Sequence, residues 1–293
     1  MARLCTIRAE NVKLCRLVAR SCSAAVALDV LIPRPGLSSF RSPRADPHPL
    51  DIAYTAGIAY EACMRACMTP RSWILRWKRA VREMVRAVGN TLAGALFLLS
   101  LQSASIGTSL SRLGRLVEED VMGSAMECVD VAGTEGAIAY IEVLGLISSS
   151  YLWRIGWSGI PDVTTGRLAL DTLRSSGLTL SKLLAAASIY DVVSKDAATG
   201  FSISFGLAKP LIAAESSLAD GVRKATYAVV YYEGDLLLRR KCYEQRELWG
   251  RALAGDEEAE AVLWRTYTGC GPGSAADIVI NAAAYTIAER AIR

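Results

Sequence analysis

The chain has 293 residues and a mass of 31.5 kDa, with 52% hydrophobic residues, 21% charged residues and a net charge of +4. This length can bury a full hydrophobic core, and the composition excludes a disordered or collagen-like chain. The charge is too small to require nucleic acid as a partner, but residues 1–86 carry 15 Lys+Arg against 6 Asp+Glu. Such a basic amino-terminal third can gather phosphate groups.

Apolar residues recur at helical spacing along most of the chain, and no alternating strand pattern recurs. Residues 215–241 are helix-like, although the β-branched and aromatic run 228–232 leaves a strand open. The sequence predicts an all-α protein, a single multi-helix domain over residues 1–293. The predicted helices cover residues 8–31, 51–68, 73–88, 112–130, 132–150, 168–173 and 178–194, the uncharged run described next, a helix opening at 255–258 and a last helix ending at 293.

One segment is long enough to span a bilayer, because no charged residue stands between Arg86 and Arg112. It contains polar side chains throughout, Gln102 among them, and lacks aromatic residues at its ends. We therefore expect a buried central apolar helix and no membrane partner.

The eight cysteines form no CxxC pair, and the chain contains a single histidine that could join them as a metal ligand. Cys63 and Cys67 lie one helical turn apart, but nothing nearby completes a zinc site. Charged residues interrupt the first apolar segment, so no signal peptide is predicted. The sequence indicates buried free thiols and a cytoplasmic protein.

The loop between Pro33 and Asp51 interrupts two apolar helices with prolines, arginines and the single histidine, His48. Gly36 follows Pro35, which predicts a tight turn that a ligand can approach closely. So polar a loop is either a solvated connection or a binding site on rigid helices.

Two further turns are candidates for binding. Asn90 and Thr91 stand near a helix start, where backbone N–H groups point outward and can bind an anion, although from these residues alone a plain helix cap is the better explanation. The glycine-rich turn at 269–277 fits neither a P-loop nor a Rossmann fingerprint.

Four short motifs stand in the order and at the spacing of a known family. They are Arg34-Pro35-Gly36-Leu37; Gly89-Asn90-Thr91 followed by Gly94-Ala95; Tyr190-Asp191-Val192-Val193 with Thr199-Gly200-Phe201; and Pro272-Gly273-Ser274-Ala275-Ala276-Asp277. Together they resemble the triphosphoribosyl-dephospho-CoA synthases, in particular their archaeal-type members, over roughly residues 8–290. The family is all-helical, which agrees with the periodicity.

The resemblance implies an enzyme of coenzyme and prosthetic-group biosynthesis that transfers a triphosphoribosyl group from ATP to 3′-dephospho-CoA and releases adenine. It implies small-molecule substrates, ATP and dephospho-CoA, and Mg²⁺ as cofactor. Such a transfer needs cations around two anionic molecules and a carboxylate at the attacking hydroxyl. The catalytic candidates are Asp51, Asp191 and Asp277, the last two also as metal ligands; the nucleotide- and phosphate-binding candidates are Arg34, Gly36, Arg41, Arg44, Asn90, Thr91, Gly273 and Ser274.

The chain departs from the family at two places. Leu92-Ala93 replaces a His-Lys pair, and Ser38-Ser39 replaces a frequent Val-Asp. These departures keep two alternatives open: a related nucleotide-using enzyme with a different acceptor, and a non-catalytic interaction protein that uses the basic helix at 73–88. A homodimer also stays open. If the family assignment holds, Arg34, Asn90, Asp191 and Asp277 should converge on one pocket.

Overall fold

The computed structural model describes residues 9–147, 160–162 and 165–292, and every regular element in these ranges is a helix. The expectation of an all-α fold is confirmed. In chain order the elements are α1 (Ala9–Leu31), α2 (Pro49–Met68), η1 (Pro70–Ser72), α3 (Trp73–Val88), α4 (Ala93–Leu113), α5 (Glu118–Leu146), α7 (Arg167–Ser176), α8 (Leu180–Ala187), α9 (Val192–Ala198), η3 (Ser204–Ala208), α10 (Lys209–Ala214), α11 (Leu218–Tyr232), α12 (Leu236–Lys241), α13 (Arg246–Leu253), α14 (Glu257–Thr266) and α15 (Gly273–Ile292).

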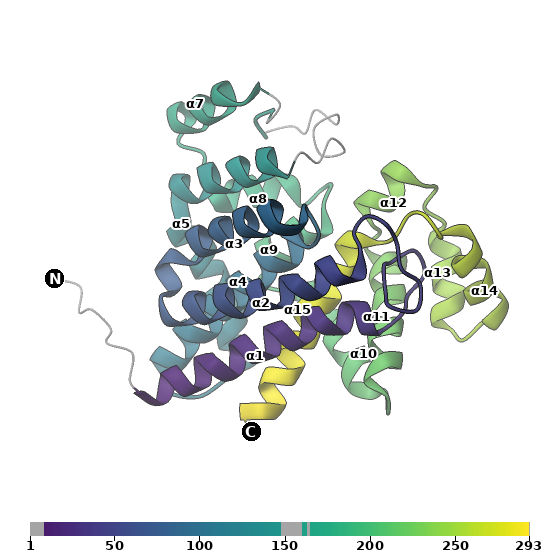
Figure 1. The fold of residues 1–293 in the computed structure, drawn as a ribbon. Coiled ribbons are helices and arrows are strands. Elements are labelled where there is room, and N and C mark those ends of the chain that lie inside the picture. The colour runs from purple at the N-terminus through teal and green to yellow at the C-terminus, as the bar shows by residue number, and fades with distance from the viewer. Residues whose placement is uncertain (1–8, 148–159, 163–164, 293) are drawn as a thin grey trace.

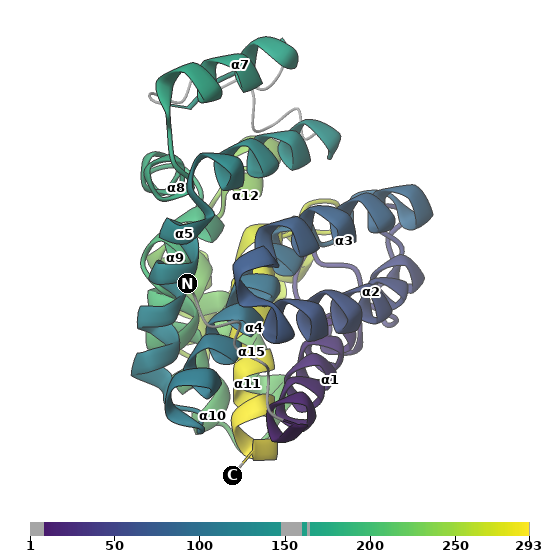
Figure 2. The same ribbon diagram turned by 90° about the vertical axis from the view of Figure 1, so that its left-hand side faces the viewer.

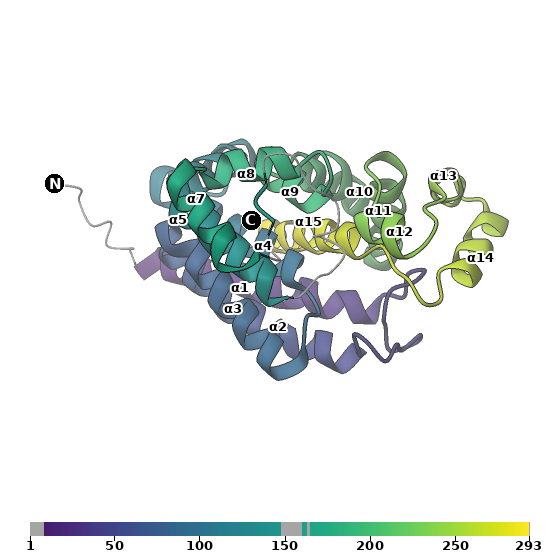
Figure 3. The same ribbon diagram turned by 90° about the horizontal axis from the view of Figure 1, so that it is seen from above.

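Two apolar helices, α4 and α15, form the centre of the fold. Helix α15 contacts α1 and α4 on one side and α9, α10, α11 and η3 on the other (Figures 1 and 3). Helix α4 is long and apolar enough to cross a membrane, but 89% of its apolar window is buried inside the protein. The predicted buried central helix is therefore confirmed.

The remaining helices form two groups around this centre. Helices α1, α2 and α3 lie on one side of α15, whereas α5, α8 and α9 lie on the other (Figure 2). Helix α7 packs on α5 at the edge of the molecule, and α12–α14 extend beyond the start of α15 (Figure 1).

Several boundaries differ from the sequence prediction. The run 228–232 is helical within α11, because Ala228, Val229 and Val230 are buried on a helix packed against α13 and α15. The predicted helix 178–194 is two helices, α8 and α9, because the Asp191 side chain caps a new helix. The predicted break near residue 131 is a kink at Gly133, whose φ of 55° places it in the left-handed region.

Four cysteines predicted to be free thiols are paired in the structure. Cys15 and Cys67 join α1 to the end of α2, and Cys242 and Cys270 join the end of α12 to the turn before α15. The prediction was wrong for these four because spacing along the chain does not show which helix ends meet. Cys22, Cys63 and Cys128 are buried free thiols, as expected.

A buried polar cluster fixes the centre of the fold. The Asp196 carboxylate accepts hydrogen bonds from the backbone N–H groups of Ile203 and Ser204 at 2.8 and 2.9 Å, and from the Ser204 hydroxyl at 2.5 Å. The Asn281 amide in turn donates to the Ser204 hydroxyl at 3.1 Å. These bonds join α9, η3 and α15, so the helix that carries Asp191 is held firmly against the central helix.

Candidate active site

A cavity of about 550 Å³ lies where the starts of α4, α9 and α15 meet the loop after α1. Its size suits a ligand site. Seven stretches that are distant from one another in the sequence line it, and they include most of the motifs singled out above. Its lining includes the predicted residues Arg44, Asn90, Thr91, Asp191, Gly273, Ser274 and Asp277.

The Pro-Gly turn and the glycine-rich turn contact each other backbone to backbone. Gly36 has φ +73°, and an added Cβ there would overlap the carbonyl of Cys270. A Cβ at Gly271 would likewise overlap the carbonyl of Gly36. Both positions therefore require glycine, and Gly36 supports the cavity wall instead of lining it.

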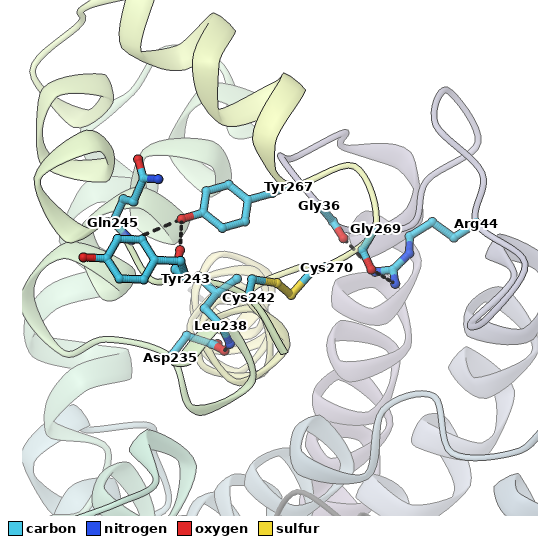
Figure 4. Close-up of a disulfide and its surroundings, with 10 residues drawn as sticks. All are labelled: Gly36, Arg44, Asp235, Leu238, Cys242, Tyr243, Gln245, Tyr267, Gly269 and Cys270. Atoms are coloured by element: carbon cyan, nitrogen blue, oxygen red, sulfur yellow. Dashed lines mark hydrogen bonds between the residues drawn. A yellow bond between two sulfur atoms is a disulfide. The ribbon is translucent and has the colours of Figure 1, made fainter. Parts of the chain in front are cut away.

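Arg44 ties these two turns together. Its guanidinium donates hydrogen bonds to the carbonyls of Gly36 and Gly269, both at 2.8 Å (Figure 4). Next to this bridge, the disulfide between Cys242 and Cys270 joins the same turn to α12 (Figure 4). Arg44 thus contributes positive charge to the cavity rim and holds the wall in place.

Asp277 lies on the first turns of α15 and faces the start of α4. Its Oδ2 packs against Gly94, where any side chain would overlap it, and it accepts a hydrogen bond from the backbone of Ala95. Burial raises the pKa of Asp277 well above its usual range, and the nearby carboxylates of Asp29 and Asp191 raise it further.

Asp191 is the N-cap of α9. Its Oδ2 accepts hydrogen bonds from the Ser194 backbone at 2.8 Å and from the Ser194 hydroxyl at 2.7 Å. Burial raises the pKa of Asp191, and the hydrogen bonds from Ser194 act in the opposite direction. Asp191 therefore caps α9 and also lines the cavity.

Arg34 does not line the cavity. Its side chain is fully buried and forms an ion pair with Asp29, in the last turns of α1. It also donates to the Thr226 hydroxyl at 3.4 Å and to the Asp29 carbonyl at 3.3 Å. Asp29, rather than Arg34, reaches the cavity.

Two other predicted residues also stand apart from the lining. Arg41 is exposed on the loop. Asp51 belongs to a capping box at the start of α2, in which its Oδ2 accepts from the His48 backbone at 3.3 Å. The N-cap there is His48, and Asp51 stands at the third position of the helix.

The sequence pattern of the family described as ATP:dephospho-CoA triphosphoribosyl transferase matches residues 15–291. The chain belongs to this family. No curated protein gives a significant match. A crystal structure from Archaeoglobus fulgidus, provisionally named a triphosphoribosyl-dephospho-CoA synthase, shares the fold, with a TM-score of 0.62 at 19% identity. That similarity covers 80% of this chain and 96% of the other.

Membership of the family makes this chain a triphosphoribosyl-dephospho-CoA synthase-like transferase, as the motifs predicted. The resemblance rested on short motifs, and the family match now covers nearly the whole chain. The expectation that ATP is a substrate agrees with the family's description.

Some cavity residues of this transferase were not predicted from the sequence. Asp29 and Tyr140 each sit within an ordinary helical pattern, with no motif to mark them. Trp77, Phe97 and Tyr140 form an aromatic wall, with the rings of Trp77 and Phe97 4.8 Å apart. The apolar periodicity of α3 and α4 predicted that Trp77 and Phe97 are buried but not that they border a cavity. Lys241 also lines the cavity, and the basic run that it forms with Arg239-Arg240 was the one sequence feature that could have indicated it.

Asp235 does not line the cavity but connects two helices that border it. Its Oδ1 caps α12 through Leu238 N–H at 3.0 Å, and its Oδ2 accepts from Ala275 N–H at 2.9 Å at the start of α15. One carboxylate thus holds two helix starts together. Burial raises the pKa of Asp235 to about 6.

Proposed function

We propose that this chain transfers the triphosphoribosyl group of ATP to a hydroxyl of 3′-dephospho-CoA and releases adenine. The observation that supports this proposal is the convergence of Asn90-Thr91, Asp191 and the 273–277 turn on one cavity. In an unrelated helical protein we would expect these distant segments to lie on different parts of the surface. The match to the family's sequence pattern is the independent support.

The phosphate end of ATP fits the side of the cavity where α4 and α15 begin. Asn90 and Thr91 precede α4, and Gly273 and Ser274 open α15. Helix starts carry N–H groups without a partner inside the helix and a partial positive charge, which favour phosphate. The N–H groups of Ala95 and Ala275 bond to Asp277 and Asp235, so phosphate would bind to the other N–H groups of these turns. Arg44 and Lys241 add positive charge from the rim.

The reaction moves one proton as well as the sugar. The acceptor oxygen bonds to C1′ of the ATP ribose, and the bond from C1′ to adenine N9 breaks with its electron pair going to adenine. The hydroxyl therefore loses a proton and adenine gains one. Asp191, whose carboxylate is steadied by two donors from Ser194, is suited to accept the hydroxyl proton. Asp277, whose pKa is strongly raised, is suited to hold the proton that adenine needs.

The carboxylates also fit a magnesium ion shared with the substrate. No cluster of three potential ligands that could hold a metal by themselves occurs among the described residues. Mg²⁺ is commonly held by one or two carboxylates together with substrate phosphates, and Asp191 and Asp277 are cavity carboxylates of that kind. Because a metal-bound carboxylate is ionised, Asp277 would bind the ion only in its deprotonated form. When bound, the ion would neutralise triphosphate charge. We also infer a cytoplasmic location, where ATP and coenzyme precursors are present; a homodimer stays a prediction.

The direct test is to incubate the protein with ATP, Mg²⁺ and dephospho-CoA and to measure free adenine by chromatography. We expect adenine from the wild type and a loss of roughly a hundredfold or more in Asp191→Asn. The matched control is Asp171→Asn, because Asp171 is exposed on α7, away from the cavity. Absence of adenine with every acceptor tried would contradict the proposal.

A second candidate is the same transfer to a different acceptor. It is favoured by Leu92 and Ala93, which line the cavity with apolar surface where the family carries His-Lys. This candidate predicts adenine release with another hydroxyl-bearing coenzyme precursor and not with dephospho-CoA. Assaying a panel of acceptors at equal concentration separates the two.

A further inference from the structure

The Asp29 carboxylate has one oxygen that is held inside the protein and one that is free. Its Oδ1 forms the ion pair with Arg34, whose guanidinium also donates a hydrogen bond to the Asp29 carbonyl at 3.3 Å. Its Oδ2 has no hydrogen-bond partner among the described residues, although only 4% of the side chain is exposed. Asp29 lines the cavity, and its Oδ2 is not one of the fully enclosed unpaired atoms of the described residues, so the free oxygen faces the cavity.

A free acceptor on so deeply buried a side chain suits a ligand group that donates a hydrogen bond. As a carboxylate paired with a guanidinium, Asp29 accepts hydrogen bonds and donates none. Buried acceptors in proteins are normally paired, by the protein itself, by water or by a ligand. Arg34 holds both the side chain and the backbone carbonyl of Asp29, so the free oxygen is already oriented before a ligand enters, and little ordering remains to oppose binding.

The charge of Asp29 limits which part of a nucleotide can lie against it. A carboxylate repels phosphate, which fits the starts of α4 and α15 and the cations Arg44 and Lys241 instead. The groups of ATP that donate hydrogen bonds and carry no charge are the two ribose hydroxyls and the amino group of adenine. The free oxygen of Asp29 therefore suits the nucleoside part of the ligand.

The position of Asp29 favours the ribose over the base. Asp29 lies close enough to Asp277 to affect it electrostatically, and Asp277 is the residue to which the proposed reaction assigns the proton for the leaving adenine. The 2′-hydroxyl of the ribose is on the carbon next to the one that carries adenine, whereas the adenine amino group is at the far edge of the base. An acidic side chain is also the group that binds a ribose hydroxyl in dinucleotide sites.

We propose that Asp29 binds the 2′- and 3′-hydroxyls of the ATP ribose and makes the site select ribonucleotides over deoxyribonucleotides. This inference rests on the proposed function and assigns a sugar-binding residue to the same site. The two residues of the buried ion pair then have different roles, because Arg34 orients the carboxylate and Asp29 contacts the ligand. Asp29 takes no part in the proton transfers of the reaction.

The test compares the affinities of ATP, 2′-deoxy-ATP and 3′-deoxy-ATP, measured by calorimetry with Mg²⁺ and without an acceptor. The wild type should bind at least one of the deoxynucleotides roughly ten- to a hundredfold more weakly than ATP, the loss that corresponds to one hydrogen bond to a charged group. In Asp29→Asn this discrimination should shrink, because an amide carries no charge. In Arg34→Met/Asp29→Leu, where no polar group remains, the three nucleotides should bind equally.

The second variant also protects the test against unfolding. Asp29→Asn leaves the Arg34 guanidinium buried without its counter-ion, whereas replacing a whole buried ion pair with apolar side chains is often tolerated. Thermal melting monitors folding in both. The matched control is Asp46→Asn, because Asp46 also lines the cavity but is exposed on the loop. This control removes the same charge and should keep the full discrimination between ATP and its deoxy analogues.

Two results would overturn the inference: equal binding of the three nucleotides by the wild type, or unchanged discrimination in both Asp29 variants. The second result is also what a magnesium-binding role for Asp29 would produce, because the three nucleotides carry the same triphosphate and would all lose affinity equally.

Failure of the proposed function is a separate outcome. If discrimination depends on Asp29 but no acceptor yields adenine, the transfer reaction is rejected and the ribose contact stands. If adenine is released while both Asp29 variants still discriminate, the transfer stands and the ribose contact is rejected. A wild type that does not bind Mg-ATP rejects both.

Discussion

Arg34 and Asp29 form an ion pair in which both side chains are almost completely buried, Arg34 at 0% and Asp29 at 4% exposure. The arginine of the Pro-Gly motif therefore does not reach a ligand directly. It compensates the charge of an aspartate at the cavity, next to Asp277, whose pKa that aspartate raises.

The first prediction concerns this pair. Arg34→Met leaves the buried Asp29 carboxylate without its cation, which typically costs about 3–5 kcal/mol of unfolding free energy. The double variant Arg34→Met/Asp29→Asn should recover much of that loss, because no uncompensated charge remains. Urea unfolding at pH 7 measures both. If the single and double variants are equally destabilised, charge compensation is not the role of Arg34.

The second prediction tests the close contact between Gly94 and Asp277. Gly94→Ala places a methyl group where the Asp277 Oδ2 lies, so Asp277 must move. Alanine is the better helix former by about 1 kcal/mol, so the fold should tolerate the change. We expect affinity for Mg-ATP, measured by calorimetry, to fall roughly tenfold or more. The control Gly57→Ala on α2 meets no atom within 4 Å and should bind normally. Normal binding by Gly94→Ala would separate Asp277 from the nucleotide site.

The packing of each helix also explains which helices and site residues could be predicted from the sequence. Apolar periodicity predicted α1, α3, α4 and α15 because each buries a long, continuous face. The short α13, with two buried residues, carried too weak a pattern to be recognised. Asn90, Asp191 and Asp277 were predicted as site residues from motifs in which a glycine-containing turn or a helix start can approach a ligand. All three line the cavity.

The remaining site residues depend on contacts that a single sequence does not encode locally. Tyr140 lines the cavity from the part of α5 that follows the kink at Gly133, and its hydrogen-bond partner Ser194 is 54 residues away. Asp29 looks like an ordinary polar residue near the end of α1 until Arg34 folds back onto it. Arg34 was predicted to bind phosphate because its sequence context does not show that it folds back onto Asp29, five residues earlier in the chain.

The third prediction concerns stability and pH. Burial raises the pKa of Asp196 and of Asp235 to about 6, above the usual value of 3.8. Between these pH values the folded chain binds more protons than the unfolded chain, so the free energy of unfolding falls as pH rises. For each group we expect the free energy of unfolding to be higher below pH 4 than above pH 6 by an amount on the order of 3 kcal/mol, and to fall between these pH values.

The variant Asp196→Asn isolates one of these contributions. Asparagine keeps a side-chain oxygen for the N–H groups of Ile203 and Ser204 but does not titrate. Urea unfolding measured from pH 4 to pH 7 should show a shallower decline in this variant than in the wild type. Parallel curves would mean that Asp196 does not titrate in this range.

The fourth prediction concerns the disulfide between Cys15 and Cys67, which closes a separation of 52 residues. In the chain-entropy picture a cross-link of this span stabilises the folded state by about 4 kcal/mol. The variant Cys15→Ser/Cys67→Ser should lower the melting temperature by several degrees at least and leave Mg-ATP affinity unchanged, since neither cysteine lines the cavity. An unchanged melting temperature would show that these thiols are not paired in solution.

The last prediction concerns the second disulfide, because Cys242–Cys270 adjoins the site. Cys270 lines the cavity, and so do Leu237 and Lys241 on the helix that Cys242 ends. In Cys242→Ser/Cys270→Ser the turn is still held by Arg44 and by Tyr267, which donates to the Tyr243 carbonyl at 2.8 Å (Figure 4). The fold should therefore survive. Ligand binding must then order a looser wall, and ordering each side chain costs about 0.5–1.5 kcal/mol.

We accordingly expect Mg-ATP affinity to fall several-fold in Cys242→Ser/Cys270→Ser, with a smaller loss of melting temperature than in Cys15→Ser/Cys67→Ser. The two cysteine pairs thus serve as controls for each other, one acting on stability and one on binding. Treating the wild type with a reductant should reproduce both effects together. If the Cys242–Cys270 variant binds Mg-ATP as tightly as the wild type, Arg44 and the Gly36–Gly271 contact are sufficient to hold the cavity wall, and the disulfide contributes nothing to the site.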